Sequence, residues 1–222
     1  MPRIDGALAT PLADRRRGRE MVRLMVATNT IASLHRPLML TLDEGYAEEF
    51  GQAVAKGDRV VLLTLLVNAL KEAVDAFWEV ADLAEELFEY IKSEPIYAQY
   101  QDLLARADRK DPASVYSRLI APIPENVALH WDRAAAENTL AGIAPVRGVL
   151  QTYHQSDRGR AVSRFPLADE LYARTMLGNT TPPQLRAAIA EIRDFATTFQ
   201  LVAEHLIAMF LRALGCHPND LD

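Results

Sequence analysis

Arg147 and His154 are the two residues of this sequence whose types and spacing best fit chemistry on a phosphate ester. A guanidinium group can hold two phosphate oxygens at once, and an imidazole near neutral pH can take or give a proton. The two residues are seven positions apart, which is close to two turns of an α-helix. A helix through this segment would therefore place both side chains on one face, where they could reach one phosphodiester.

The segment 145–166 that holds this pair is locally basic. Asp157 is its only acidic residue, and three arginines follow the histidine: Arg158, Arg160 and Arg164. The whole chain is acidic, with 24 Lys and Arg against 30 Asp and Glu and a net charge of −6. Because the positive charge is concentrated here, the bulk charge does not exclude a nucleic acid at this segment.

The segment resembles the signature of the HEPN superfamily of helical bundles, including its abortive-infection branch. That signature is Arg, a polar residue, four to six further residues and then His, placed late in the chain before a loop and a final helix. Arg147 and His154 have this spacing, and a loop and a long C-terminal helix follow them. Gly148 stands where the family has a polar residue, and Tyr153 where Ala is common.

The resemblance implies an RNA-binding or metal-independent RNA-cleaving component of a defence or toxin system. Arg147 would bind the scissile phosphate, and His154 would be the acid or base in attack by the RNA 2′-hydroxyl. Arg158, Arg160 and Arg164 would contact phosphates. The family usually acts as a dimer with two facing motifs, so a homodimer, RNA and a small antitoxin-like protein are the implied partners.

Other familiar chemistries do not fit the sequence. No His has a Glu three residues before it, so a di-iron bundle is excluded, and no phosphate-binding glycine loop or Gly-x-Ser-x-Gly elbow is present. The single cysteine, Cys216, excludes a disulfide framework and zinc sites with two or more Cys ligands. We therefore expect no metal and no cofactor.

A row of six acidic residues recurs every three or four positions: Glu72, Asp75, Glu79, Asp82, Glu86 and Glu89. On one helix they would form a single acidic face, which is most simply a solvated surface. The alternative is a docking surface for a basic segment of the chain or for a basic partner. The N-terminal arginines are candidates for such a segment: Arg15, Arg16, Arg17, Arg19 and Arg23.

Hydrophobic periodicity predicts two long helices that position these residues. One spans about 59–93 and ends before Pro95. The other spans about 181–214, with Thr181 as N-cap, prolines in the first turn and Gly215 after the last turn. Shorter helices are expected over Arg15–Leu34, Asp43–Lys56, parts of 95–124, Asn126–Ile143 continuing through Pro145–His154, and Leu167–Leu177. Gln155–Pro166 reads as a loop, and no strand is predicted.

These elements predict an all-α, up-and-down helical bundle, one domain over 1–222 with 1–14 as a disordered tail. The apolar residues of 201–214 cover more of the helix surface than one packing stripe. This indicates a second buried face and therefore favours a homodimer. No signal peptide or membrane span is visible, so we expect a cytoplasmic protein without membrane contact. Two functions stay open: the RNA-directed protein, and a non-catalytic oligomeric binding or regulatory module.

Overall fold

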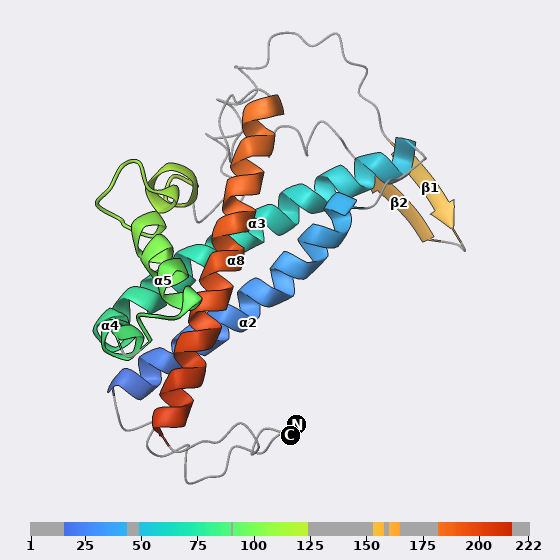
Figure 1. The fold of residues 1–222 in the computed structure, drawn as a ribbon. Coiled ribbons are helices and arrows are strands. Elements are labelled where there is room, and N and C mark those ends of the chain that lie inside the picture. Colours follow the sequence, from blue (N-terminus) through green and yellow to red (C-terminus); the bar gives the residue numbers. More distant parts are fainter. Residues whose placement is uncertain are drawn as a thin grey trace.

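Two long helices, α2 (Arg16–Asp43) and α3 (Glu49–Glu79), run side by side in opposite directions (Figure 1). The computed structural model describes residues 16–43, 49–89, 91–123, 153–157, 160–164 and 182–214. Within them, the buried residues of α2, α3, α4, α5 and α8 form one hydrophobic cluster. The predicted all-α helical bundle is confirmed.

Helix α2 continues beyond the end predicted before Pro37. A proline lacks the N–H that would bond the preceding turn, which favours a helix end. Here the extra turns bury Leu38, which is only 1% exposed. In addition, the guanidinium of Arg59 on α3 donates from Nε to the carbonyl of Thr41 at 2.7 Å, which satisfies an acceptor in the last turns of α2.

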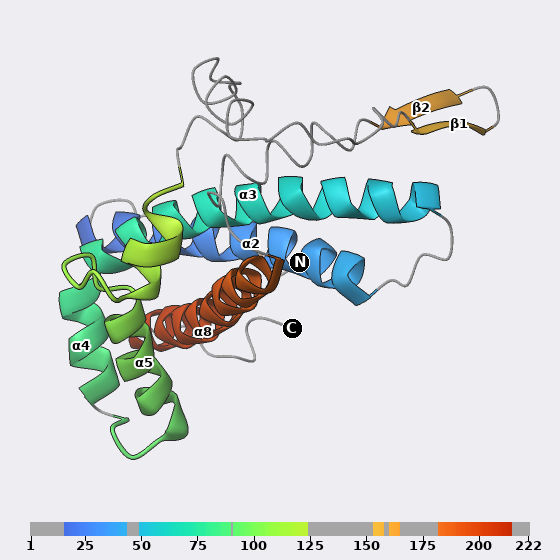
Figure 2. The ribbon, with the colours of Figure 1, turned by 90° about the horizontal axis from the view of Figure 1, so that it is seen from above.

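Helix α3 begins earlier and ends earlier than the predicted helix over 59–93. It runs through Gly57, where the sequence suggested a break, and this glycine is buried. At Val80 the chain turns: the N–H of Val80 donates to the carbonyl of Phe77 at 3.1 Å, and α4 (Ala81–Glu89) then leaves in a new direction (Figure 2).

Aromatic packing explains the bend at Val80. Tyr100 on α5 contacts Phe77 of α3 and Phe88 of α4, with ring centroids 6.5 and 4.2 Å away. In a straight helix these two phenylalanines would lie about 16 Å apart along the axis, too far to flank one ring. The bend therefore lets all three rings enter one core.

Helix α5 (Pro95–Arg106) starts with Pro95 in its first turn, so the Glu94-Pro95 step separates two helices as predicted. A single π-helical turn, η1 (Tyr116–Ile120), follows and buries Ile120. Short helical pieces were predicted for this region, and they are confirmed as far as residue 123.

The last helix, α8 (Pro182–Ala213), matches its prediction within a residue at each end. It crosses the α2–α3 pair and also contacts α4 and α5 (Figure 1). Leu206 and Phe210 are buried, while Leu201, Ile207 and Met209 pack against the core. Helices of the same chain thus bury part of the wide apolar surface that suggested a dimer, and the homodimer stays a prediction.

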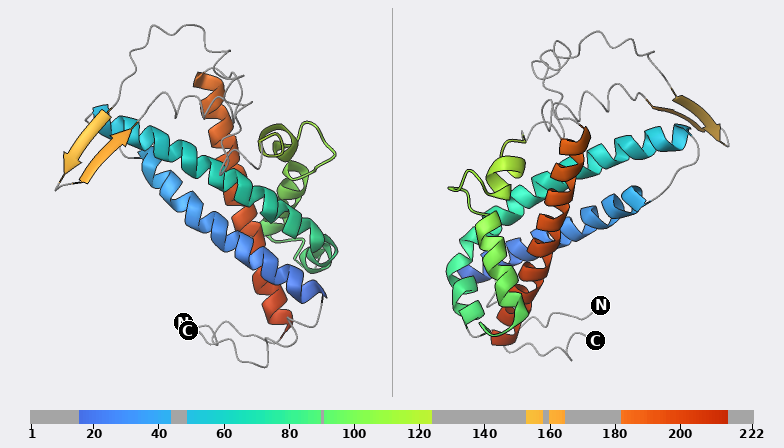
Figure 3. Two further views of the ribbon diagram at one scale, coloured as in Figure 1. Left: turned by 180° about the vertical axis from the view of Figure 1, so that it is seen from behind. Right: turned by 45° about the horizontal axis from the view of Figure 1, so that its top comes forward.

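A β-hairpin is the main departure from the predicted elements. Strands β1 (Tyr153–Asp157) and β2 (Arg160–Arg164) pair antiparallel, and β1 contacts α3 (Figure 3). The prediction of a helix reaching His154 and of a loop from Gln155 is wrong for these ten residues.

The predicted helices over 126–143 and 167–177 and the tail 1–14 lie outside the described residues. In the described helices, no segment has both the length and the apolar character needed to cross a membrane.

Candidate functional site

The residues predicted to act on a phosphodiester are only partly described by the structure. His154 lies in β1, and Arg160 and Arg164 are the two end residues of β2. Arg147 and Arg158 lie outside the described residues. The helical register that was expected to align Arg147 with His154 does not reach His154, because the chain there is a paired strand.

The register of the hairpin separates His154 from the two arginines of β2. His154 is opposite Ser163, whereas Arg164 is opposite Tyr153 and Arg160 is opposite Asp157. Successive positions along a strand alternate between the two faces of a ladder. His154 therefore occupies a position on one face, and Arg160 and Arg164 occupy positions on the other. The RNA-directed function stays a prediction.

The acidic row is divided by the bend and is partly paired within the chain. Glu72 accepts from Arg23 at 3.4 Å, and Glu86 pairs with Arg17 at 3.6 Å. The prediction that N-terminal arginines dock on the acidic row is therefore confirmed for Glu72 and Glu86. Arg19 is exposed, Arg15 lies outside the described residues, and the side chain of Arg16 is not described. The pairs are exposed, so each contributes about 1 kcal/mol or less.

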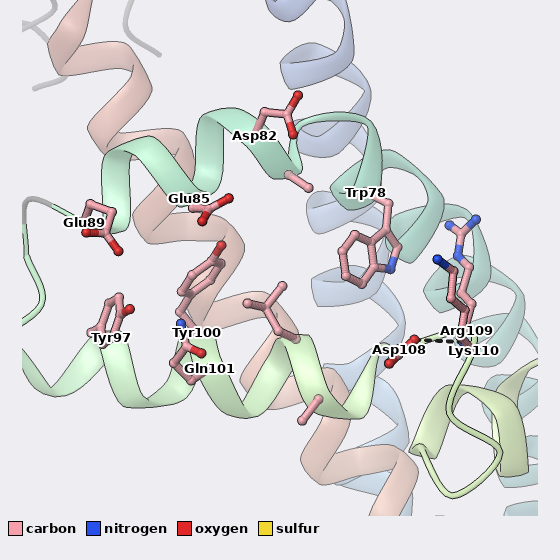
Figure 4. A pocket seen from close by; sticks show the side chains of 13 residues that line it. Trp78, Asp82, Glu85, Glu89, Tyr97, Tyr100, Gln101, Asp108, Arg109 and Lys110 are labelled. Atoms are coloured by element: carbon pink, nitrogen blue, oxygen red, sulfur yellow. Dashed lines mark hydrogen bonds between the residues drawn. The ribbon is translucent and has the colours of Figure 1, made fainter.

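A pocket of about 790 Å³ lies between α4 and α5 and is the best-formed candidate site in the described part of the chain (Figure 4). The bend at Val80 creates it, because α4 would otherwise continue the axis of α3 away from α5. Three aromatic side chains line the pocket: Trp78, Tyr97 and Tyr100. Glu85 and Glu89 of α4 lie above the two tyrosines, and Asp82 of α4 also belongs to the lining (Figure 4).

Tyr100 is the central residue of this pocket. Its side chain rises from α5 toward α4 and brings its hydroxyl next to Glu85 (Figure 4). The ring stacks on Phe88 with 8° between the planes, and the residue is only 3% exposed. Burial, followed by the negative charge of Glu85, raises the pKa of Tyr100 to about 12. The hydroxyl has no hydrogen-bond partner among the described residues.

Two carboxylates at this end of the pocket differ in their partners. Glu89 forms an ion pair with the ammonium group of Lys92, and this hydrogen bond raises the pKa of Lys92. Glu85 has no ion-pair partner in the described part of the chain. Together, the unpaired carboxylate and the neutral tyrosine hydroxyl offer a ligand hydrogen-bond acceptors on both groups and a donor on the hydroxyl.

The opposite end of the pocket carries positive side chains that are held in a turn. Trp78 donates from Nε1 to the carbonyl of Ala107 at 3.2 Å, and Asp108 accepts the N–H of Lys110 at 2.8 Å. Arg109 pairs with Asp75 and lies over the ring of Tyr116, 5.7 Å from its centroid. The charge of Arg109 is therefore already compensated.

A shallow groove of about 840 Å³ lies between α2 and α3. Its walls are mostly small or apolar, and Val26 on its edge is 61% exposed. The paired Arg23 and Glu72 both line it, and the buried Oδ1 of Asn68 has no hydrogen-bond partner there. Unlike the α4–α5 pocket, this groove offers no aromatic wall.

Sequence reasoning missed the α4–α5 pocket. Phe77 is fully buried, whereas its neighbour Trp78 lines the pocket. The acidic row included Asp82 and Glu89, but as a solvated or docking face rather than a pocket wall, and Glu85, Tyr97 and Tyr100 were not singled out. The one available signal was Pro95, which marks the start of a separate helix able to lie beside α4.

Among the described residues, no three His, Cys, Asp or Glu side chains gather closely enough to hold a metal ion. Comparison of the chain with family models, curated proteins and solved structures found no match.

Proposed function

We propose that this protein is a ligand-binding helical module that holds an organic ammonium ion in the pocket between α4 and α5. The observation that carries this proposal is the hydroxyl of Tyr100, which lines the pocket, lacks a hydrogen-bond partner among the described residues and lies next to the unpaired carboxylate of Glu85. A hydroxyl that faces a pocket without a protein partner is available to a ligand that supplies the hydrogen bond.

The aromatic walls support a cation rather than an anion. Tyr97 and Tyr100 lie with ring centroids 6.1 Å apart beneath Glu85 and Glu89. Aromatic faces attract cations, by about 0.5–1 kcal/mol at exposed sites and about 2 kcal/mol where water is excluded. An ammonium bound here would meet a carboxylate on one side and aromatic rings on the other.

This proposal develops the non-catalytic alternative of the two functions that the sequence left open. The pocket places no nucleophile beside a general base: Tyr100 is neutral at physiological pH, since its pKa is about 12. Recognition of a ligand therefore fits the described geometry better than a covalent step at this pocket.

Fluorescence of Trp78 tests the proposal. The chain has two tryptophans, so in a Trp131→Phe background Trp78, which lines the pocket, is the sole reporter. We expect butylamine to change the emission of Trp78 saturably, with a dissociation constant of about a millimolar. Butanol, which lacks the charge, should bind at least about tenfold more weakly because a charged hydrogen bond is lost.

Two neighbouring glutamates provide a matched pair of variants. Glu85 lines the pocket, whereas Glu86 pairs with Arg17 and is not one of the lining residues. Glu85→Gln should weaken butylamine binding about tenfold, and Glu86→Gln should leave it unchanged. Equal weakening by both substitutions, or no saturable change in emission, would refute the proposed function.

A further inference from the structure

The α4 wall of the pocket offers two carboxylates, although one ammonium needs only one. Glu85 and Glu89 both line the pocket and are four residues apart on α4. This separation corresponds to about 6 Å along the helix axis. Their side chains point into the same region above Tyr97 and Tyr100 (Figure 4).

Glu89 already holds an ammonium group, that of Lys92. Lys92 lies outside the residues that line the pocket, and its side chain is 56% exposed. An exposed ion pair of this kind is weak, so a second ammonium can exchange with it. The structure therefore contains one example of the contact that a ligand would make at Glu89.

The charge of the pocket fits a dication. Its lining includes four carboxylates and two cationic side chains: Asp82, Glu85, Glu89 and Asp108; Arg109 and Lys110. Four negative charges minus two positive charges leave a net charge of −2. The apolar side chain of Leu104 and the tyrosine rings can cover the methylene stem that joins two ammonium groups.

Resting on the proposed function, we infer that the ligand is a linear diamine or polyamine whose ammonium groups are about one helical turn apart. One ammonium binds between Glu85 and the hydroxyl of Tyr100. The second binds Glu89 and displaces Lys92. The hydroxyl of Tyr100, which lines the pocket and has no hydrogen-bond partner among the described residues, fixes the first position, and the Lys92–Glu89 pair marks the second.

Affinities of tetramethylenediamine and butylamine for the full chain in the Trp131→Phe background test this inference. The two probes share a four-carbon stem and differ by one ammonium. We expect the diamine to bind about threefold to tenfold more tightly. Glu89→Gln should abolish this ratio and leave the butylamine affinity within about twofold, whereas Glu86→Gln, with the same change of charge, should preserve the ratio. Lys92→Gln should increase the ratio, because the competing ammonium is gone.

The outcomes separate the two proposals. If butylamine binds but the diamine binds no more tightly, the diamine inference fails and the proposed function stands. If neither amine binds, both fail. Loss of the ratio in Glu86→Gln as well as Glu89→Gln would show a bulk charge effect and overturn the inference. An unchanged ratio in Lys92→Gln would contradict the exchange at Glu89.

Discussion

Tyr100 shows how much the role of one residue depends on distant packing. Nothing in the sequence distinguishes it from the other tyrosines among the seven. Its burial against Phe77 and Phe88 follows from the bend at Val80, which places two helices around one ring. A residue whose partners come from two elements with different axes cannot be identified from periodicity along either element.

His154 illustrates the opposite case. The sequence singled out this residue, but the local structure predicted for it, a helix, was wrong. A spacing of seven residues aligns two side chains only if the segment is helical. The alternating pattern of Arg160–Arg164 is short and mostly polar, so it gave no strand signal, and the pairing of β1 with β2 became visible only in the structure.

His35 on α2 is expected to make stability depend on pH. Its Nε2 is buried and has no hydrogen-bond partner among the described residues, and burial, with a smaller effect from Arg193, lowers the pKa of His35 below 6.5. The unfolded chain therefore binds more protons than the folded chain below about pH 6.5. The stability due to neutral His35 is present above this pH and is lost as the pH falls.

Urea unfolding of the wild type and of His35→Gln at pH 7.5 and pH 5 measures this effect. The wild type should lose more free energy of unfolding over this range than the variant, because the variant lacks the titrating imidazole. The other histidines are the same in both proteins, so their contributions cancel in the difference. Identical pH dependence in the two proteins would show that His35 is not protonated differently on folding.

At the scale of elements, the sequence predicted which helices exist better than it predicted where they begin and end. Thr181 with its two following prolines marked the start of α8, and the apolar stripe continued to its end. The bend between α3 and α4 was not predictable in this way. The stripe of apolar residues is compatible with one straight helix and with two helices joined by a bend. No Pro or Gly stands at Val80 to mark a helix break.

Phe199 joins α8 to the bent helices and should contribute strongly to stability. It is fully buried, and its ring centroid lies 6.0 Å from that of Phe77 and 6.5 Å from that of Phe195. Phe199→Ala should lower the free energy of unfolding by about 3–5 kcal/mol through lost burial and a cavity. Chemical denaturation followed by circular dichroism measures the loss.

Two substitutions on α8 serve as references for this value. Phe199→Leu retains most of the buried volume, so it should cost about 1.5 kcal/mol or less. Ala208→Ser changes an exposed position and should alter stability by about 0.5 kcal/mol or less. A loss at Phe199→Ala no greater than at Ala208→Ser would contradict the assignment of this ring to the core.

For the whole molecule, the folded chain gives the acidic row three partners from distant segments and one, Lys92, from the next turn. Arg17 and Arg23 reach it from α2, Arg109 from the turn after α5, and Lys92 from the α4–α5 connection. The net charge of −6 therefore does not describe a uniform acidic surface. In the described part of the chain, Asp82 and Glu85 stay without an ion-pair partner, and both line the pocket.

Intermolecular nuclear Overhauser effects from bound butylamine test the location of the binding site most directly. We predict effects from the methylene protons of the amine to the ring protons of Trp78, Tyr97 and Tyr100, which line the pocket between α4 and α5. Effects confined to Val26 and its neighbours, in the groove between α2 and α3, would contradict the assignment of an ammonium site to the α4–α5 pocket.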